Sequence, residues 1–376
     1  MVYPTMARKV ERFSSPGKGN GLRAVSSLKA GELLCSAEPF ACCVSKKAMK
    51  YSCENCFSRK DKLLRCSQCK TARYCDAGCQ KRSWPEHKVE CQRLKHLHPA
   101  IPPDSVRLVA KIVFRLVRRS HKPSEDLYTL EELESHLSEM SAEKRRELED
   151  LGIALRMYLK DEAEDLLQLP PGLDPISIIA KVTCNCFSIS DGELQEVGVG
   201  LYPSMSLLNH ACRPNCVMVF EGRTLRLRAV RDIQPLEELT ISYTDVMTPS
   251  KERRKQLQDQ YYFLCQCERC TTADQDSDML SGPRKPGHQS SAIFPESSSS
   301  NQSRSGSRSW RRARPSSAAA LGPSRTGTST CSGCWTWPWT RASTWPSGSG
   351  PWSSAPEPCS PMGCIIQTPT QRGPFS

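Results

Sequence analysis

Eight side chains that can bind a metal lie within residues 53–91, arranged in four pairs. Zn²⁺ needs four donors that converge on one point, and thiolate and imidazole groups are among its preferred ligands. Eight such donors predict two closed structural zinc sites, although the spacing alone does not decide which pairs share a metal. The pairs are Cys53 and Cys56, Cys66 and Cys69, Cys75 and Cys79, and His87 and Cys91.

A second group of residues that could do chemistry lies further along the chain. Residues 209–216 read Asn-His-Ala-Cys-Arg-Pro-Asn-Cys, and a strand-like segment that ends at Tyr243 follows them. Three cysteines with the spacing C-x-C-x2-C come next, at Cys265, Cys267 and Cys270. Taken alone, Tyr243 is an ordinary strand tyrosine. The Asn-His pair nearby in sequence favours a catalytic role instead.

Charge and cysteine content limit the class of protein. The formal net charge is +12, and residues 46–96 hold fourteen Lys/Arg against five Asp/Glu, so the zinc-rich segment is basic. Such a segment faces nucleic acid or an acidic partner, or it is only a solvated surface. We find no apolar stretch that predicts a signal peptide or a membrane span. We therefore expect an intracellular protein whose 21 cysteines are reduced and bind metal in part.

Short strands and several helices must position these residues. Residues 8–45 predict strands around a glycine-rich turn at 17–21, and strand character returns over 216–243. Elsewhere, apolar residues recur at helical spacing, and Thr129 with Glu132 matches a capping box at a helix start. The predicted helices cover residues 104–116, 129–140, 148–159, 176–187 and 250–260.

The composition changes after Gly282. Residues 283–376 contain thirteen Pro, six of the seven Trp, ten Lys/Arg and two Glu, without a periodic apolar pattern. Such a segment cannot bury enough apolar surface to offset the entropy of ordering, so we predict a disordered tail. Cys331 and Cys334 form a lone pair there and are not assigned to a metal.

These motifs resemble two known domain families. The spacing C-x2-C-x9-C-x2-C-x5-C-x3-C-x7-H-x3-C is similar to a MYND zinc finger. Residues 209–216, the segment from Glu237 to Tyr243 and the last three cysteines resemble the SET domain of protein lysine methyltransferases. A MYND finger inserted into a SET domain is typical of the SMYD family, and the resemblance covers about residues 8–282.

The resemblance implies an α+β fold. It consists of a β-rich SET domain with an inserted MYND zinc finger and helical insert, a zinc-binding post-SET segment and a disordered C-terminal tail. The expected parts are residues 8–52 (N-terminal SET part), 53–91 (MYND finger), 100–180 (helical insert), 181–245 (SET core), 246–272 (post-SET zinc segment) and 283–376 (disordered or aberrant tail).

The resemblance also assigns metal ligands, because the ligand pairs of MYND fingers interleave. It implies one zinc bound by Cys53, Cys56, Cys75 and Cys79, and another bound by Cys66, Cys69, His87 and Cys91. It implies a third zinc bound by Cys212, Cys265, Cys267 and Cys270. Without the resemblance these last four could be separate core thiols, but their grouping favours a metal site.

By the same resemblance, S-adenosylmethionine is the cofactor and Tyr243 is the catalytic residue. Tyr261 and Phe263 would line the substrate channel or cover the cofactor. Residues expected to bind the cofactor are Lys18, Asn20, Tyr128, Glu134, Asn185, Asn209, His210, Tyr243 and Phe263.

Several positions depart from the family pattern. Lys18 replaces the usual Arg, and His136 stands where an Asn often contacts the cofactor. Leu236 replaces a turn glycine, which costs about 1 kcal/mol if the turn needs a positive φ. The family continues with a helical, tetratricopeptide-like domain that walls the substrate cleft, whereas here an unpatterned segment follows. We therefore expect lower activity or an altered choice of substrate.

The implied activity is an S-adenosylmethionine-dependent histone and protein-lysine N-methyltransferase of cytoplasm and nucleus. Its partners would be histone tails or other proteins with a target lysine, and it would act as a monomer without a membrane partner. The lysine must lose its proton in a poorly solvated channel before it attacks. The alternative is a non-catalytic adaptor whose MYND finger binds proline-rich peptides or DNA.

Overall fold

The computed structural model describes residues 9–118, 127–160, 169–272 and 276–280. All of them belong to the unit Met1–Trp335, and the second unit, Thr336–Ser376, lies outside the described residues. The predicted disorder of residues 283–376, with Cys331 and Cys334, also falls outside them. None of the helices in the described ranges is long and apolar enough to cross a membrane.

A four-stranded sheet joins the beginning of the chain to segments near residues 210 and 240. Its strand order is β1-β2-β12-β9, with β1 and β2 antiparallel, β12 antiparallel to β2, and β9 parallel to β12. The predicted glycine-rich turn connects β1 to β2. The strands are β1 (Val10–Ser15), β2 (Gly19–Ala24), β9 (Asn209–His210) and β12 (Glu238–Ile241).

Two three-stranded sheets complete the β-rich part. In β11, Leu225, Leu227 and Ala229 are buried while the residues between them are partly exposed, as the predicted alternation requires. The strand orders are β10-β11-β3 and β4-β8-β7. These strands are β3 (Leu33–Ala37), β4 (Ala41–Val44), β7 (Cys186–Ser190), β8 (Glu196–Leu201), β10 (Cys216–Glu221) and β11 (Thr224–Ala229).

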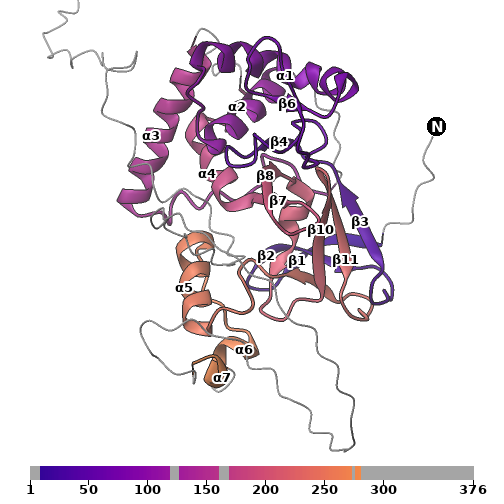
Figure 1. Ribbon diagram of the computed structural model, residues 1–376. Helices are drawn as coiled ribbons and strands as arrows, with labels where there is room; N and C mark the ends of the chain where they lie inside the picture. Colours follow the sequence, from indigo (N-terminus) through magenta and orange to yellow (C-terminus); the bar gives the residue numbers. More distant parts are fainter. Residues whose placement is uncertain (1–8, 119–126, 161–168, 273–275, 281–376) are drawn as a thin grey trace, which may run out of the picture. The chain divides into compact units, whose positions relative to one another are not determined.

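The helices form where the sequence supplies caps and an apolar face. Ser141 caps α3 by accepting from the Lys144 amide, and Asp174 caps α4 with Pro175 at its first turn. Helix α2 packs against β4, α3 and α4, as Figure 1 shows. The helices are α1 (Ala77–Leu97), α2 (Asp104–Val117), α3 (Ala142–Leu159), α4 (Pro175–Asn185), α5 (Ser250–Tyr261), α6 (Glu268–Thr271), α7 (Ser277–Leu280) and the 3₁₀ helix η2 (Pro203–Leu207).

The helix predicted over residues 129–140 is wrong, because this segment forms turns. The capping-box contact exists, since the Thr129 amide donates to Glu132 Oε2 at 3.0 Å, but no helix follows it. His136 has a φ of +52°, which interrupts a right-handed helix. Two carbonyls of the segment accept from the side chain of Lys181 on α4 instead of from helical amides.

The fourth predicted helix ends two residues early, because residue 186 begins β7. Strands β7 and β8 were not predicted. Close packing requires a glycine at position 198 of β8, because a Cβ on Gly198 would lie 2.6 Å from the Cys43 carbonyl oxygen and 2.4 Å from the Phe57 ring. The sheet order β4-β8-β7 therefore depends on a glycine in β8.

Leu236 has a φ of +64°, which confirms that the turn before β12 uses the left-handed backbone. Its side chain is 61% exposed, so little apolar burial offsets the strain.

Candidate functional site

The first predicted metal cluster is assembled from a knuckle at residues 53–56 and the start of α1. The sulfur atoms of Cys53, Cys56, Cys75 and Cys79 all lie within 4.8 Å of one another. Cys56 Sγ is 3.6 Å from Cys75 Sγ and 4.0 Å from Cys79 Sγ. Four thiolates at about 2.3 Å from one Zn²⁺ in a tetrahedron are separated by about 3.8 Å. The cluster is therefore capable of binding zinc, and its sulfur spacing is too wide for disulfides.

The second cluster joins the hairpin of β5 (Leu64–Arg65) and β6 (Arg73–Tyr74) to the middle of α1. Cys66 Sγ lies 3.7 Å from Cys91 Sγ, and Cys69 Sγ lies 3.7 Å from His87 Nε2. All four donors are buried, and His87 and Cys91 are one helical turn apart on α1. This geometry also fits tetrahedral zinc with four protein ligands.

The third cluster connects Cys212, two residues after β9, with the segment that follows α5. Cys212 Sγ lies 3.4 Å from Cys270 Sγ and 3.9 Å from Cys265 Sγ, and Cys267 completes the set. The fully buried Arg253 donates to Cys270 Sγ at 3.6 Å, which places a positive charge beside the sulfurs. Such a neighbour stabilises thiolate ligands of a metal. The cluster is capable of binding zinc.

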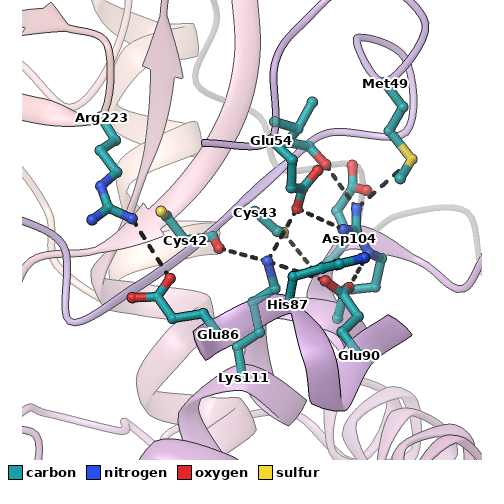
Figure 2. A network of polar contacts seen from close by, with 12 residues as sticks. Cys42, Cys43, Met49, Glu54, Glu86, His87, Glu90, Asp104, Lys111 and Arg223 are labelled. Atoms are coloured by element: carbon teal, nitrogen blue, oxygen red, sulfur yellow. Dashed lines mark hydrogen bonds and ion pairs between the residues drawn. The ribbon is translucent and has the colours of Figure 1, made fainter. Parts of the chain in front are cut away.

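A buried network of ion pairs fixes the metal-binding module to α2 and β4 (Figure 2). Arg107 of α2 donates to Glu54 Oε1 at 3.0 Å, to Glu90 Oε1 at 2.6 Å and to the Val44 carbonyl at 2.8 Å. Lys111 lies 3.1 Å from Glu54 Oε1 and 3.2 Å from Glu90 Oε2. Glu54 follows Cys53 of the first cluster, and Glu90 precedes Cys91 of the second. The network therefore holds a residue next to one ligand of each of these two clusters.

The charges of this network compensate one another. Burial alone would raise the pKa of Glu90, but Arg107 and Lys111 outweigh it and lower that pKa to about 2. Burial opposes the charge of Arg107 as well, but Glu90 and Glu54 raise its pKa. Glu90 is therefore ionised at neutral pH and pairs with two cations, Arg107 and Lys111.

Away from the metals, donors gather around Glu238 at the start of β12. They are Ser15 Oγ at 2.8 Å, Asn209 Nδ2 at 2.9 Å and Lys18 Nζ at 2.9 Å. Burial alone would raise the pKa of Glu238, but its bonds with Lys18, Asn209 and Ser15 lower that pKa below the usual value. A Cβ at Gly21 would lie 3.1 Å from Glu238 Oε1, so a glycine leaves room for this carboxylate.

Aromatic rings meet at the end of β12, around Tyr243. Its hydroxyl donates to the Leu208 carbonyl at 2.6 Å, and its backbone amide donates to His210 Nδ1 at 3.0 Å. The ring centroid of Tyr243 lies 4.7 Å from that of Tyr261, 5.4 Å from His210 and 6.4 Å from Phe263. Burial, with a smaller effect of the Glu238 charge, raises the pKa of Tyr243, so its hydroxyl stays protonated.

His210 links this aromatic group to the third cluster. Since its Nδ1 accepts from the Tyr243 amide, the proton lies on Nε2, which is 3.2 Å from Cys212 Sγ. Burial, followed by the nearby charges of Arg253 and Lys18, lowers the pKa of His210 to about 4. The ring is neutral near pH 7 and holds the end of β12 against a metal-binding segment.

A narrow cavity of about 50 Å³ opens beside Tyr243. A cavity of this size holds little more than one water molecule or the end of a slender side chain. Its walls come from α4, β7, η2, β10, the end of β12 and the last residue of α5. They are formed by Cys184, Asn185, Cys186, Phe187, Ser206, Leu208, Met218, Ile241, Ser242, Tyr243 and Tyr261.

The structure brings most of the predicted cofactor residues into two adjoining groups. Lys18 and Asn209 meet at Glu238, and the Asn20 carbonyl accepts from Asn209 Nδ2 at 3.1 Å. His210, Tyr243 and Phe263 form the aromatic group. Because Asn209 and His210 are neighbours in β9, the two groups share an edge.

The three remaining predicted residues lie at the margins. Asn185 lines the cavity, and its Nδ2 donates to the Glu134 carbonyl at 2.9 Å. Glu134 is exposed and contacts this set through its backbone. The guanidinium carbon of Arg12 lies over the Tyr128 ring, 4.8 Å from the ring centroid. Arg12 Nε also donates to Asn20 Oδ1 at 3.2 Å.

Sequence reasoning missed Glu238, Arg12 and the Arg107 network. Glu238 belonged to a recognised motif but was not singled out, although an acid inside an apolar strand segment signals a buried role. Arg107 and Lys111 are one helical turn apart on a helix that is otherwise mostly apolar, and that pair of cations could have identified the network.

A sequence model of the SET domain matches residues 19–244. This range contains Asn209, His210, Glu238 and Tyr243, together with the two clusters in residues 53–91. The chain therefore belongs to the SET domain family.

The chain is also similar to individual SMYD proteins, which confirms the predicted SMYD resemblance. It is 51% identical over 274 residues to the histone-lysine N-methyltransferase SMYD3 of Homo sapiens, in an alignment that covers 73% of this chain and 64% of that protein. It is 39% identical over 269 residues to the N-lysine methyltransferase SMYD2-B of Danio rerio, in an alignment that covers 71% of this chain and 61% of that protein. The chain thus spans a little under two thirds of these relatives.

Among solved structures, the SET domain of LSMT bound to lysine and AdoHcy has a TM-score of 0.35 and 14% identity. The alignment covers 69% of this chain and 54% of that one. At this level of similarity it supports no argument about the site.

Proposed function

We propose that this chain is an S-adenosylmethionine-dependent N-methyltransferase that modifies lysine side chains of histones or other proteins. The observation that carries the proposal is the hydroxyl of a partly buried tyrosine at a narrow cavity, inside a region that matches the SET domain. The names of the SMYD3 and SMYD2-B relatives, both lysine methyltransferases, support it.

We propose that the Glu238 group holds the amino-acid end of the cofactor. Asn209 uses its amide nitrogen on Glu238 and Asn20, which leaves its Oδ1 to accept from an ammonium group. Lys18 supplies a positive charge for a carboxylate. Bound there, S-adenosylmethionine would supply an electrophilic methyl group. The residues proposed to bind it are Lys18, Asn20, Tyr128, Glu134, Asn185, Asn209, His210, Tyr243 and Phe263.

We assign the catalytic role to Tyr243. Its hydroxyl proton is directed to the Leu208 carbonyl, so its oxygen lone pairs can accept from the N–H of a substrate amine. The rings of Tyr243 and Tyr261 make the cavity wall apolar, which favours the neutral lysine that can attack. Orientation of the amine, rather than proton abstraction by the tyrosine, is the role that a neutral hydroxyl supports.

We propose that the three clusters bind three structural zinc ions. Each has four protein donors and so leaves no position open for substrate. The parts of the chain would be the SET segments 8–52 and 181–245, the MYND finger 53–91, the helical insert 100–180 and the post-SET segment 246–272.

Methyl transfer tests the enzymatic proposal directly. The full chain with radiolabelled S-adenosylmethionine should label bulk histones, and Tyr243→Phe should abolish labelling while retaining cofactor binding. Calorimetry should show stoichiometric binding of S-adenosylmethionine that Asn209→Ala removes. Binding without transfer to histones or to a mixed protein extract would reject the enzyme.

A second candidate is a non-catalytic adaptor, favoured by the closed metal sites and the basic charge of residues 46–96. Its MYND finger would bind proline-rich peptides or DNA. Absence of S-adenosylmethionine binding together with retained peptide or DNA binding would favour it. For either candidate we propose a monomer in cytoplasm and nucleus.

A further inference from the structure

A second, larger cavity lies on the metal-binding module. It has a volume of about 560 Å³ and shares none of its lining residues with the cavity at Tyr243. A volume of this size is within the usual range for ligand sites. Its lining residues are Gln68, Trp84, Lys88, Val89, Cys91, Gln92, Lys95 and Arg118.

One side of this cavity is a stripe along α1. Trp84, Lys88, Gln92 and Lys95 follow one another at intervals of four, four and three residues, which places them on one helix face. Arg118, at the end of α2, adds a third cation. The lining contains no carboxylate, and within the part of the chain that the structure describes none of these three cations pairs with an acid.

The cavity also has apolar surface. Val89 and Cys91 are 7% and 3% exposed and form a buried floor, while the Trp84 ring is 42% exposed. The side-chain amides of Gln68 and Gln92 can both donate to and accept from a peptide backbone. A buried apolar floor beside three cations suits an apolar side chain flanked by acids, whereas a nucleic-acid strand would use the cations and stack its bases on Trp84. The test below separates the two.

We propose that this cavity, which we call the α1 groove, binds an acidic peptide segment of a partner protein. An apolar side chain of that peptide packs on Trp84, and flanking Asp or Glu residues pair with Lys88, Lys95 and Arg118. Charge complementarity selects the partner, while the tryptophan and the amides fix one register. The proposal does not depend on methyl transfer.

The test uses the full chain and a fluorescein-labelled decapeptide with one central Leu between Glu and Asp residues. Fluorescence anisotropy should show saturable binding that weakens between 50 and 200 mM NaCl, where screening increases. The double variant Lys88→Glu with Lys95→Glu should lower the affinity at least about tenfold, because two attractive charges become repulsive.

The matched control is Lys81→Glu with Lys62→Glu, which changes the net charge equally at two exposed lysines outside the groove. It should bind the peptide as the unchanged protein does. Zinc content should be equal in all three proteins, so that a loss of binding does not reflect an unfolded module.

Three results would overturn the proposal. The first is that the acidic peptide does not bind. The second is an equal loss of binding in both double variants, which would show attraction to overall charge. The third is tighter binding of a neutral proline-rich peptide or a 20-bp DNA duplex at the same groove lysines, which would assign the groove to that class of ligand.

Discussion

Glu238 is the residue around which the proposed cofactor pocket is organised. Its carboxylate accepts from Ser15, Lys18 and Asn209, which belong to two distant parts of the chain. A charged acceptor orients both the amide of Asn209 and the ammonium of Lys18. Hydrogen bonds to charged groups contribute about 1.5–3 kcal/mol each. Positioning by Glu238 should therefore be measurable in cofactor affinity.

We expect Glu238→Gln to weaken S-adenosylmethionine binding about tenfold, since about 1.4 kcal/mol of orientation and charge is lost. Isothermal titration calorimetry gives this value directly. Glu11→Gln is the control, because Glu11 pairs with Arg23 on the same sheet in an exposed ion pair of little energetic value. Equal affinities for both variants would remove Glu238 from the pocket.

Protonation of Tyr243 gives a second prediction at this scale. Because the pKa of Tyr243 is raised, its hydroxyl remains neutral across the range in which a lysine of pKa about 10.4 loses its proton. We expect the methylation rate at saturating cofactor to rise steadily from pH 7 to 10. A decline within that range, with zinc content and circular dichroism unchanged, would show that the tyrosine ionises earlier.

Leu236 gives a prediction about stability. Replacing it with glycine removes a left-handed strain of about 1–2 kcal/mol, while the freer unfolded chain opposes this by about 0.4–1 kcal/mol. Leu236→Gly should therefore raise the melting temperature by about 2 °C. Leu236→Ala removes the same exposed side chain but keeps the strained Cβ, so it should give no increase. Equal shifts in both variants would contradict the strain.

At the scale of elements, the Arg107 network explains how a metal-binding module with little apolar content of its own is attached to the β-rich part. Helix α2 carries both cations, and each carboxylate follows or precedes a metal ligand. We expect Arg107→Ala to destabilise the protein by about 3–5 kcal/mol, because two carboxylates lose a buried partner. Chemical denaturation would measure this change.

The control for Arg107 is Lys29→Ala, which removes an ion pair with Asp232 whose side chains are 77% and 56% exposed. It should change stability by less than about 1 kcal/mol. A similar small effect for Arg107→Ala would mean that water or other groups replace its contacts.

The third cluster yields a separate prediction. Cys267→Ser should reduce the zinc content from three equivalents to two, and it should weaken cofactor binding because Phe263 is no longer held near His210. Cys35→Ser is the control, since Cys35 is outside all three clusters and should retain three equivalents. Elemental analysis with calorimetry measures both. Full zinc content in Cys267→Ser would show that Cys267 is not a ligand.

Patterns of neighbouring residues predicted the metal clusters and the helix α2 correctly. The spacing of cysteines anticipated which sulfurs meet once a family resemblance supplied the pairing, and the apolar stripe of α2 anticipated a packed helix. Tertiary contacts decided the rest. Residues 129–140 form turns instead of a helix, because Lys181 donates hydrogen bonds to two of their carbonyls. Strand β8 depends on Gly198, a residue type that sequence reasoning treats as a strand breaker.

At the scale of the whole molecule, the three clusters act where the core is thin or the segments are distant. Metal binding replaces apolar packing in residues 53–91 and joins Cys212 to residues beyond α5. Excess zinc chelator should therefore lower the melting temperature sharply, and zinc should restore it. A chelated protein with unchanged melting and no bound metal would contradict a structural role.

The pairing of β2 with β12 has a consequence for how the protein is made. A ribosome must add about two hundred further residues after β2 before its second partner, β12, exists, which takes about 10–40 s at usual elongation rates. During that interval β2 can pair only with β1, so Leu22 lacks the second partner strand of its sheet. Nascent chains of this protein should therefore depend on holdase chaperones, and slow codons between residues 100 and 230 should increase misfolding in cells.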